Sequence, residues 1–366
     1  MHLQILLGAN LPVPAHFSVV DALASMEVTC SDRERSGFQM TFALDQDPTL
    51  EYELLRSGAL DPPNRMIAVV YIGTQPQVLM DGIITNHQLV PSNEPGGSMM
   101  HVTGEDISLK LDLEEKSLTF RNQSDSTIVQ NILSSYAALG LQPKITQSPE
   151  TPPDVERITS QQGTDLEFIR RLANRNGFIF YIEPTATAGV NTAYWGPESR
   201  EGRPQPALSM NMGPDTNVDE PLVFSFNALS PVTAQSTIVE TATRASQTIF
   251  PASSSQPPLA SRATAPMRRT LARDAAKLNS IQAGQRGLSS VSQAANSVTA
   301  TGEIDALRYG RVLLARKLVG VRGVGPSYDG NYYVKQVTHT LRSGEYKQKF
   351  TLTREGLGAL SQVVAL

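Results

Sequence analysis

The spacing of apolar and polar residues predicts strands throughout the first 105 residues. Short apolar or alternating runs are separated by clusters of turn-forming residues, as at 61–64 and 91–97. The runs that predict strands are 3–7, 26–31, 38–44, 66–73, 77–89 and 99–103. Several strands with no long helix between them are typical of an antiparallel barrel or sandwich.

The pattern changes to helical spacing after residue 120. Residues 124–140 place Ile128, Val129, Ile132 and Leu133 on one face, after serines that can cap a helix. A second helix is expected at 164–177, where Thr164 and Glu167 have the spacing of a capping box and Gly177 can end the helix in the left-handed conformation. The strand expected at 178–182 is apolar without alternation, which predicts burial on both faces.

The second half returns to strands and then becomes rich in small and polar residues. Strands are expected at 221–229 and 236–243. We interpret residues 250–301 as an extended Ser-, Pro-, Ala- and Gln-rich insertion with helical turns around 268–278. The spacing of Ile304, Leu307, Val312, Leu314 and Leu318 predicts a helix over 303–318.

Residues 332–353 predict a hairpin around the turn Ser343-Gly344. One register pairs Arg342 with Glu345, Leu341 with Tyr346, His339 with Gln348 and Val337 with Phe350. The same register leaves Lys347, Lys349, Thr351 and Thr353 on the opposite face. The hairpin should therefore bury one face and present polar and cationic groups on the other.

Charge is distributed unevenly along the chain. Residues 1–120 hold 6 Lys/Arg against 16 Asp/Glu, a balance of −10, whereas residues 303–356 hold 10 against 5, a balance of +5. Opposite charges at the two ends can steer copies of one chain head to tail. The alternative is that the asymmetry is incidental.

The residues support few functional classes other than a structural role. The histidines at 2, 16, 87, 101 and 339 show no zinc-protease spacing, and no serine stands in a nucleophile elbow. His339 is interpreted as a structural histidine, and the pairs Glu105-Asp106 and Glu114-Glu115 as solvated loop charge rather than a glycosidase site. The glycines at 320–325 lack the spacing of a phosphate loop. We therefore predict no enzyme activity, no cofactor, no metal site and no recognition of nucleic acid.

Cysteine content and hydrophobicity add two expectations. The single cysteine, Cys30, excludes an internal disulfide framework and is interpreted as a structural strand residue. No apolar stretch is long enough to span a bilayer, and the first residues lack the form of a signal peptide. We expect synthesis in the cytoplasm.

Four stretches, in this order, resemble one known family. They are VLMDGIITNHQL, MHVTGEDISLKLD, GTDLEFIRRLANRNGFIFYIE and YDGNYYVKQVTHTLRSGEYKQKFTLTREG. Together they resemble the hub proteins of contractile tails, that is, the phage late-control protein D and VgrG N-terminal family. The insertion at 250–301 and the first 60 residues match weakly.

The resemblance implies a mainly β fold with α+β parts, built from two tandem tube-like antiparallel β-barrels and a small α+β insert. We expect a first barrel at 1–119, an α+β bracing domain at 120–185 and a second barrel at 186–366 that carries the insertion. The resemblance also implies a homotrimer that joins a six-fold inner tube to a three-fold spike. Because only ten residues follow Gly356, the spike is expected to be a separate chain.

The resulting hypothesis is a structural baseplate hub in a phage tail or contractile injection particle, contacting the inner tube protein, the spike and other baseplate components. The residues expected to shape it are Thr164, Glu167 and Gly177 in the bracing domain, and Lys347, Lys349, Arg342 and Arg354 at a seam between copies. The alternatives are a tail-associated carbohydrate-binding or adaptor β-protein and, third, a tail cell-wall hydrolase. Solution mass, glycan binding and peptidoglycan cleavage distinguish the three.

Overall fold

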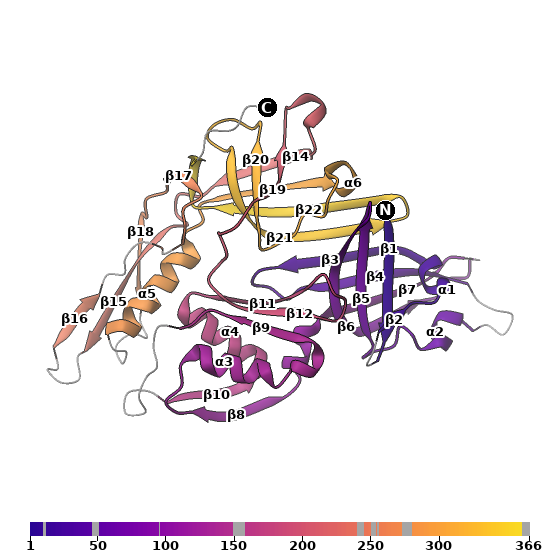
Figure 1. Cartoon of the computed structure of the whole chain (residues 1–366), viewed down its shortest axis with the longest axis horizontal. Coiled ribbons are helices and arrows are strands. Elements are labelled where there is room, and N and C mark those ends of the chain that lie inside the picture. The colour runs from indigo at the N-terminus through magenta and orange to yellow at the C-terminus, as the bar shows by residue number, and fades with distance from the viewer. Residues whose placement is uncertain are drawn as a thin grey trace.

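The computed structural model describes residues 1–9, 12–45, 51–94, 96–148, 158–239, 245–249, 254, 256–272 and 280–360. Antiparallel strands dominate these residues, and helices are short or confined to a few places (Figure 1). The predicted fold class, mainly β with α+β parts, is confirmed. For description we use three names: the first β region (β1 to β7), the middle unit (β8 to β12) and the second β region (β13 to β23).

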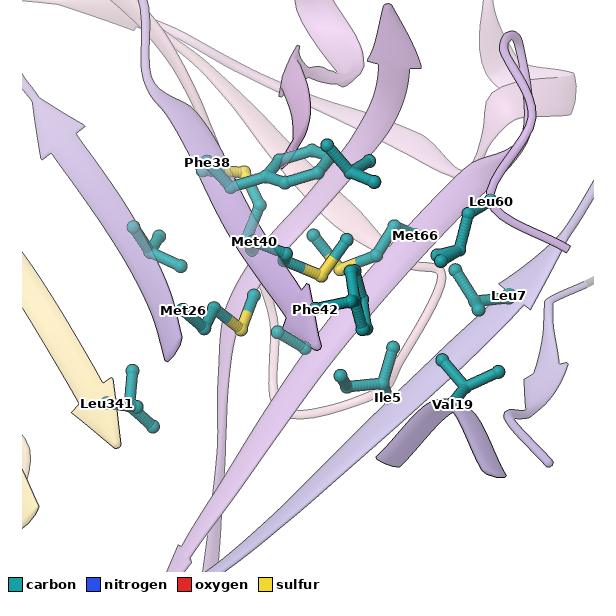
Figure 2. Packing of buried hydrophobic residues seen from close by; sticks show 14 of the residues in the cluster. Ile5, Leu7, Val19, Met26, Phe38, Met40, Phe42, Leu60, Met66 and Leu341 are labelled. Atoms are coloured by element: carbon teal, nitrogen blue, oxygen red, sulfur yellow. The ribbon is translucent and has the colours of Figure 1, made fainter. Parts of the chain in front are cut away.

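The first β region contains every strand that the sequence predicts there. Its elements are β1 (His2–Gly8), β2 (Val13–Pro14), α1 (Phe17–Asp21), β3 (Leu23–Ser31), β4 (Gly37–Leu44), α2 (Glu53–Ser57), β5 (Arg65–Ile72), β6 (Gln75–Val90) and β7 (Ser98–Asp106). Alternate residues of each strand point inward, so Met40 and Phe42 of β4 meet Met66 of β5 and Ile5 of β1 in one core (Figure 2). Leu341, from the far end of the chain, completes this core (Figure 2).

The middle unit packs two helices on small sheets. Its elements are η1 (Ile107–Leu111), β8 (Glu115–Phe120), α3 (Asp125–Ser134), η2 (Ala137–Leu139), β9 (Leu141–Ile145), β10 (Thr159–Thr164), α4 (Asp165–Asn176), β11 (Ile179–Pro184) and β12 (Asn191–Gly196). Both predicted helices are confirmed, and Ser124 caps α3 by accepting from the backbone N–H of Thr127. Strand β11 is buried on both faces as predicted, since Phe180 and Tyr181 belong to different apolar clusters.

The second β region has a larger core and an attached smaller sheet. Its main elements are β13 (Gln205–Ser209), η3 (Gly213–Asp215), β14 (Asp219–Phe226), β19 (Val298–Asp305), α6 (Ala306–Tyr309), β20 (Leu318–Arg322), β21 (Gly330–Arg342), β22 (Glu345–Arg354) and β23 (Gly356–Ala359). The attached elements are β15 (Val232–Val239), β16 (Ser246–Ile249), β17 (Ala260–Ala263), β18 (Arg268–Ala272) and α5 (Ser280–Ala294). The predicted strands at 221–229 and 236–243 correspond to β14 and β15, with 240–243 outside the described residues.

Two sequence predictions in this region are wrong. Residues 280–294 form the helix α5 rather than an extended segment, and the helical turns expected around 268 are the strand β18; residues 273–279 lie outside the described part. The helix expected over 303–318 is instead the end of β19, the four-residue helix α6 and a connection to β20. It ends early because Gly310 adopts a left-handed φ of 75°.

The two β regions share one sheet. Strand β21 pairs with β3 in antiparallel register, with Leu341 opposite Met26 and His339 opposite Val28. The path β14-β19-β22-β21-β3-β4-β7-β6-β5-β1-β2 therefore runs without a break through both ends of the sequence (Figure 1). The hairpin register predicted from the sequence is confirmed in full, including Val337 opposite Phe350.

Candidate assembly surfaces

The face of the shared sheet that points away from the cores is polar across both β regions. Paired residues on this face are Thr301 with Thr351, Thr338 with Lys349, Thr29 with Thr338, Thr340 with Glu27, and Gln39 with Thr103. All of them are partly or fully exposed. The Thr29 and Thr338 hydroxyl oxygens lie 3.0 Å apart across the boundary between the two β regions. We call this surface the open face.

The open face is hollowed where it crosses the second β region. A groove of about 560 Å³ lies over β14, β19, β22 and β21. Its lining includes Val223, Thr301, Glu303, Gln336, Thr338 and Lys349. Pro221, Val223 and Phe350 add an apolar side to this groove. The polar residues around it suit contact with water or with a hydrated partner.

Two of the predicted seam residues, Lys347 and Lys349, lie on the open face, and both face Glu303 of the neighbouring strand. The Nζ atom of Lys347 is 3.0 Å from Glu303 Oε1 and 3.6 Å from Glu345 Oε1, whereas Lys349 Nζ is 4.0 Å from Glu303 Oε2. The hydrogen bond to Glu303 raises the pKa of Lys347 above its usual value. Lys349 is the more available cation, because 71% of its side chain is exposed.

The other two predicted seam residues differ from each other. Arg342 is exposed at the hairpin end, 4.0 Å from Glu345. Arg354, in contrast, is fully buried: its guanidinium donates to the carbonyl oxygens of Ser327, Asp329 and Gly356 and stacks on Tyr332 at 4.3 Å. The expectation that Arg354 lies near a surface seam is wrong, because its guanidinium is buried and bonded to three backbone carbonyl oxygens inside the fold.

Thr164 and Glu167, at the start of α4, are placed as the sequence predicts. Thr164 Oγ1 accepts from the Glu167 backbone N–H at 3.2 Å, and Glu167 Oε2 accepts from the Thr164 backbone N–H at 3.4 Å, which completes the capping box. Thr164 Oγ1 also donates to Asp112 Oδ1 at 2.5 Å. This last contact joins the helix start to the chain that leaves the first β region.

Gly177 has a steric role that the sequence does not indicate. It ends α4 with a left-handed φ of 73°, as predicted. In addition, a Cβ added at this position would lie 3.0 Å from the Cα of Ser289 in α5. The Ser289 hydroxyl donates to the carbonyl oxygen of Asn174 at 2.7 Å. The end of α4 is therefore packed closely against a helix from the predicted insertion.

Polar contacts between the three parts were missed by the sequence analysis. Arg65 of β5 forms a bidentate pair with Asp81 of β6, at 2.7 and 2.6 Å, and donates to the carbonyl oxygens of Leu139 and Gly189 in the middle unit. Asn191 Nδ2 donates to the same Asp81 carboxylate at 2.8 Å. These side chains carry no local motif, since the partners are up to 124 positions apart.

Arg316 makes the second set of contacts between the parts. It is one of the few non-glycine residues with positive φ, at 65°. Its guanidinium donates to Ser31 O at 2.7 Å and Ser36 Oγ at 2.9 Å, and it stacks on Tyr181 of β11 at 4.2 Å. Arg316 thus reaches the first β region and the middle unit from the second β region, at the cost of a strained backbone.

The remaining residues considered for catalysis make structural contacts within the fold. His339 is buried, with Nδ1 at 2.9 Å from the Tyr346 hydroxyl and 3.1 Å from Gln348 Nε2, and burial lowers its pKa to about 3. The interpretation of His339 as a hydrogen-bonded residue across from Gln348 is confirmed. Glu105 pairs with Arg35 at 2.6 Å. Asp106 is buried and caps η1 through Ser108, so it is not the solvated charge that we expected.

Two features are absent from the described ranges. There, no group of three or more His, Cys, Asp or Glu side chains is arranged to hold a metal ion. Nor does any helix of the described part combine the length and apolar character needed to cross a bilayer.

Comparison of the sequence with family models gives one match. The model described as the Alg8 N-terminal domain matches residues 39–194, which is less than half of the chain. The matched range covers most of the first β region and the middle unit. Comparison with the sequences of curated proteins gave no match.

Comparison of the fold with solved structures gives matches over almost the whole chain. A tail protein from Neisseria meningitidis is 13% identical, with a TM-score of 0.65, and 97% of each chain is covered. The 43 kDa tail protein of prophage MuSo2 from Shewanella oneidensis is 14% identical, with a TM-score of 0.63 and coverage of 96% of this chain and 98% of that chain.

A third similar structure is the Escherichia coli c3393 protein, described as a component of the type VI secretion system with structural similarity to the T4 bacteriophage tail proteins gp27 and gp5. It is 10% identical, with a TM-score of 0.56 and coverage of 93% of this chain and 74% of that chain. The chain therefore shares its fold with proteins of phage tails and of a secretion system.

Proposed function

We propose that the chain is a structural baseplate hub of a contractile phage tail or contractile injection system. The observation that carries this proposal is the extent of the fold match, which covers nearly the full length of both this chain and the Neisseria and Shewanella tail proteins. A grafted enzyme domain or an unrelated binding module would leave part of either chain unmatched. Fold alone does not determine function, so the site features below must agree with it.

The open face agrees with a hub, because a polar sheet face suits contact with water or with neighbouring chains of a particle. It runs across both β regions on one sheet, it is polar, and it carries side chains of both signs. If three copies assemble as a ring, their two β regions together supply six tube-like units around one axis. Such a trimer can match a six-fold inner tube on one side and a three-fold spike, supplied by a separate chain, on the other.

The division into domains belongs to the same proposal: a first barrel at 1–119, an α+β bracing domain at 120–185 and a second barrel at 186–366. The apolar clusters favour it only in part. One cluster holds most of the inward residues of the first β region but also includes Leu341 and Tyr346, and the cluster of the middle unit includes Ile83. The domains would therefore act as one rigid body, with the middle unit as a brace.

The proposed role is structural, without catalysis or a cofactor. In its favour, several buried charged side chains are paired with each other, as in Arg65 with Asp81 and Arg200 with Glu198 and Glu355. His339 is held neutral by burial. The chain would be made in the cytoplasm and then incorporated into the particle together with the tube protein, the spike and other baseplate components.

The test is the copy number and position of this chain in the particle. Cryo-electron microscopy of assembled particles should show three copies around an open channel, between the inner tube and the spike. A monomer, a dimer or a six-copy ring at that level would contradict the proposal. So would a position at the particle periphery, which would favour an adhesin or adaptor instead.

A further inference from the structure

A small, largely enclosed cavity lies where the first β region, the middle unit and the second β region meet. Its volume of about 10 Å³ is close to the room that one water molecule requires. The polar lining comes from all three parts: Ser36, Asp81 and Asp106 from the first β region, Asn191 from β12, and Arg316 from the second β region. Cys30 and apolar side chains close the remainder.

Asn191 presents an unpaired acceptor in this region. The residue is 1% exposed, and its Nδ2 donates to Asp81 Oδ2 at 2.8 Å. Among the described residues, none donates a hydrogen bond to Asn191 Oδ1. Rotating the amide by half a turn would not help, because Oδ1 would then face the Asp81 carboxylate, which is also an acceptor. A buried amide oxygen without a donor is costly, so the site requires a hydrogen-bond donor.

The charges around the cavity select the kind of donor. Asp81 is already neutralised by the bidentate contact with Arg65. Asp106 and Arg316 carry opposite charges on the same lining. Burial raises the pKa of Asp106, and Arg316 opposes that rise. A monovalent cation would meet the Arg316 guanidinium at close range, and an apolar group would satisfy neither Asn191 nor Asp106. A small neutral molecule that both donates and accepts fits the lining best.

We propose that this cavity binds one water molecule that donates to Asn191 Oδ1 and bridges it to polar groups of the other two parts. The water would complete the hydrogen bonding of Asn191 and connect β12 with Ser36 or Asp106 and with Arg316. The three parts would then be joined through a shared solvent molecule in addition to the direct contacts of Arg65 and Arg316. This inference concerns the fold of one chain and stands independently of the proposed hub function.

The direct test is a crystal structure of the full chain at a resolution that shows ordered water. The expected result is one peak within hydrogen-bond distance of Asn191 Oδ1 and of at least one polar atom from another part. An empty cavity would overturn the proposal. Crystals soaked in rubidium chloride test the ionic alternative: anomalous signal from rubidium at this position would overturn it as well, because it would identify a cation site.

A variant gives a second test, in which the direction of the change in Tm depends on whether the cavity holds water. Cys30→Val adds a methyl group to the lining and should displace the water, which leaves Asn191 Oδ1 without a donor. Thermal unfolding should then show a Tm lower by roughly 2 °C or more. If the cavity were dry, the same methyl group would fill empty space and raise Tm, which would overturn the proposal. Cys30→Ser is the control: its hydroxyl is smaller and more polar than the thiol, adds no bulk to the cavity and should leave the crystallographic water in place.

Discussion

Asp32 is a buried carboxyl group whose ionised form is poorly compensated. Its side chain is 1% exposed, and the nearest cationic atom, Arg33 Nε, is 3.8 Å from Oδ2. Within the described part of the chain, Oδ1 has no hydrogen-bond partner. Burial raises the pKa of Asp32 from 3.8 to about 6, and it outweighs the attraction of Arg33, Lys335 and Arg316, while Glu198 adds to the rise. The Tyr333 hydroxyl, whose pKa is raised by burial and further by Asp32, is also unpaired there.

Asp32→Asn should therefore stabilise the chain at neutral pH. Between pH 3.8 and about 6 the folded state binds more protons than the unfolded state, so stability is lost as pH rises through this window. At pH 7 the variant should gain about 1 to 3 kcal/mol, and below pH 4 the gain should vanish. Urea unfolding at a series of pH values measures this difference. A variant less stable than the parent at pH 7 would mean that Asp32 is held by the surrounding cations after all.

His339 has the opposite pH dependence. Burial lowers its pKa from 6.5 to about 3, so over that range the unfolded state binds more protons and stability falls as pH falls. His339→Gln keeps a polar group beside Tyr346 and cannot be charged. We expect this variant to lose less stability than the parent between pH 6.5 and 4, measured by the same urea series. Equal losses would show that His339 is hydrated in the folded chain.

At the scale of elements, the close contact of α4 and α5 gives the third prediction. Gly177→Val places a β-branched residue at a left-handed φ, which costs about 1 to 3 kcal/mol, and pushes its Cβ against Ser289. Gly310→Val is the matched control, because Gly310 has a φ of 75° and open space around its Cβ direction. Both variants share the strain, and only the first disturbs packing. Thermal unfolding should therefore rank Gly177→Val below Gly310→Val; equal values would mean that α5 moves aside freely.

Strands and the hairpin could be predicted because their signals are local. Alternation along 345–352 fixes the register of β22, since a shift by one residue would bury Lys347 and Lys349. The helix α5 was missed because Ser, Gln and Gly dominate its composition and outweighed the helical spacing of its few apolar residues. Contacts with β15 and α4 stabilise the helix. The spacing of Ile304 and Leu307 looked helical, yet Ile304 is the last buried residue of a strand and Leu307 is exposed.

The contacts that fix the parts relative to one another could not be predicted. Arg316 bonds to Ser31 across 285 positions, and Asn191 to Asp81 across 110. No propensity or periodicity relates residues so far apart, and Arg354 shows the consequence: its position on a hairpin suggested a surface role, whereas three carbonyl oxygens hold it inside. The seam residues Lys347, Lys349 and Arg342 remain a prediction.

At the scale of the whole molecule, the charge asymmetry bears on how copies would meet. The first 120 residues carry −10 and residues 303–356 carry +5. In a head-to-tail ring, the acidic end of one copy would face the basic end of the next. Within one chain, however, Glu303 already faces Lys347 and Lys349, so part of the basic charge is neutralised on the open face itself. Such exposed pairs would guide association more than hold it.

The last prediction separates two roles of Lys347 and Lys349: steering a neighbouring copy, and pairing with Glu303 inside one chain. Lys347→Glu combined with Lys349→Glu should slow assembly of the ring and weaken its salt dependence, if the lysines steer a neighbouring copy. Adding Glu303→Lys restores an opposite-charge pair inside the chain without restoring a basic surface. Assembly is followed by light scattering at increasing ionic strength, with folding checked by circular dichroism.

If the triple variant regains the parent rate, the lysines serve the pair with Glu303 inside one chain. If it stays slow, they act between copies, because only the surface charge then differs from the parent. Unchanged rates in both variants would mean that the asymmetry is incidental to assembly.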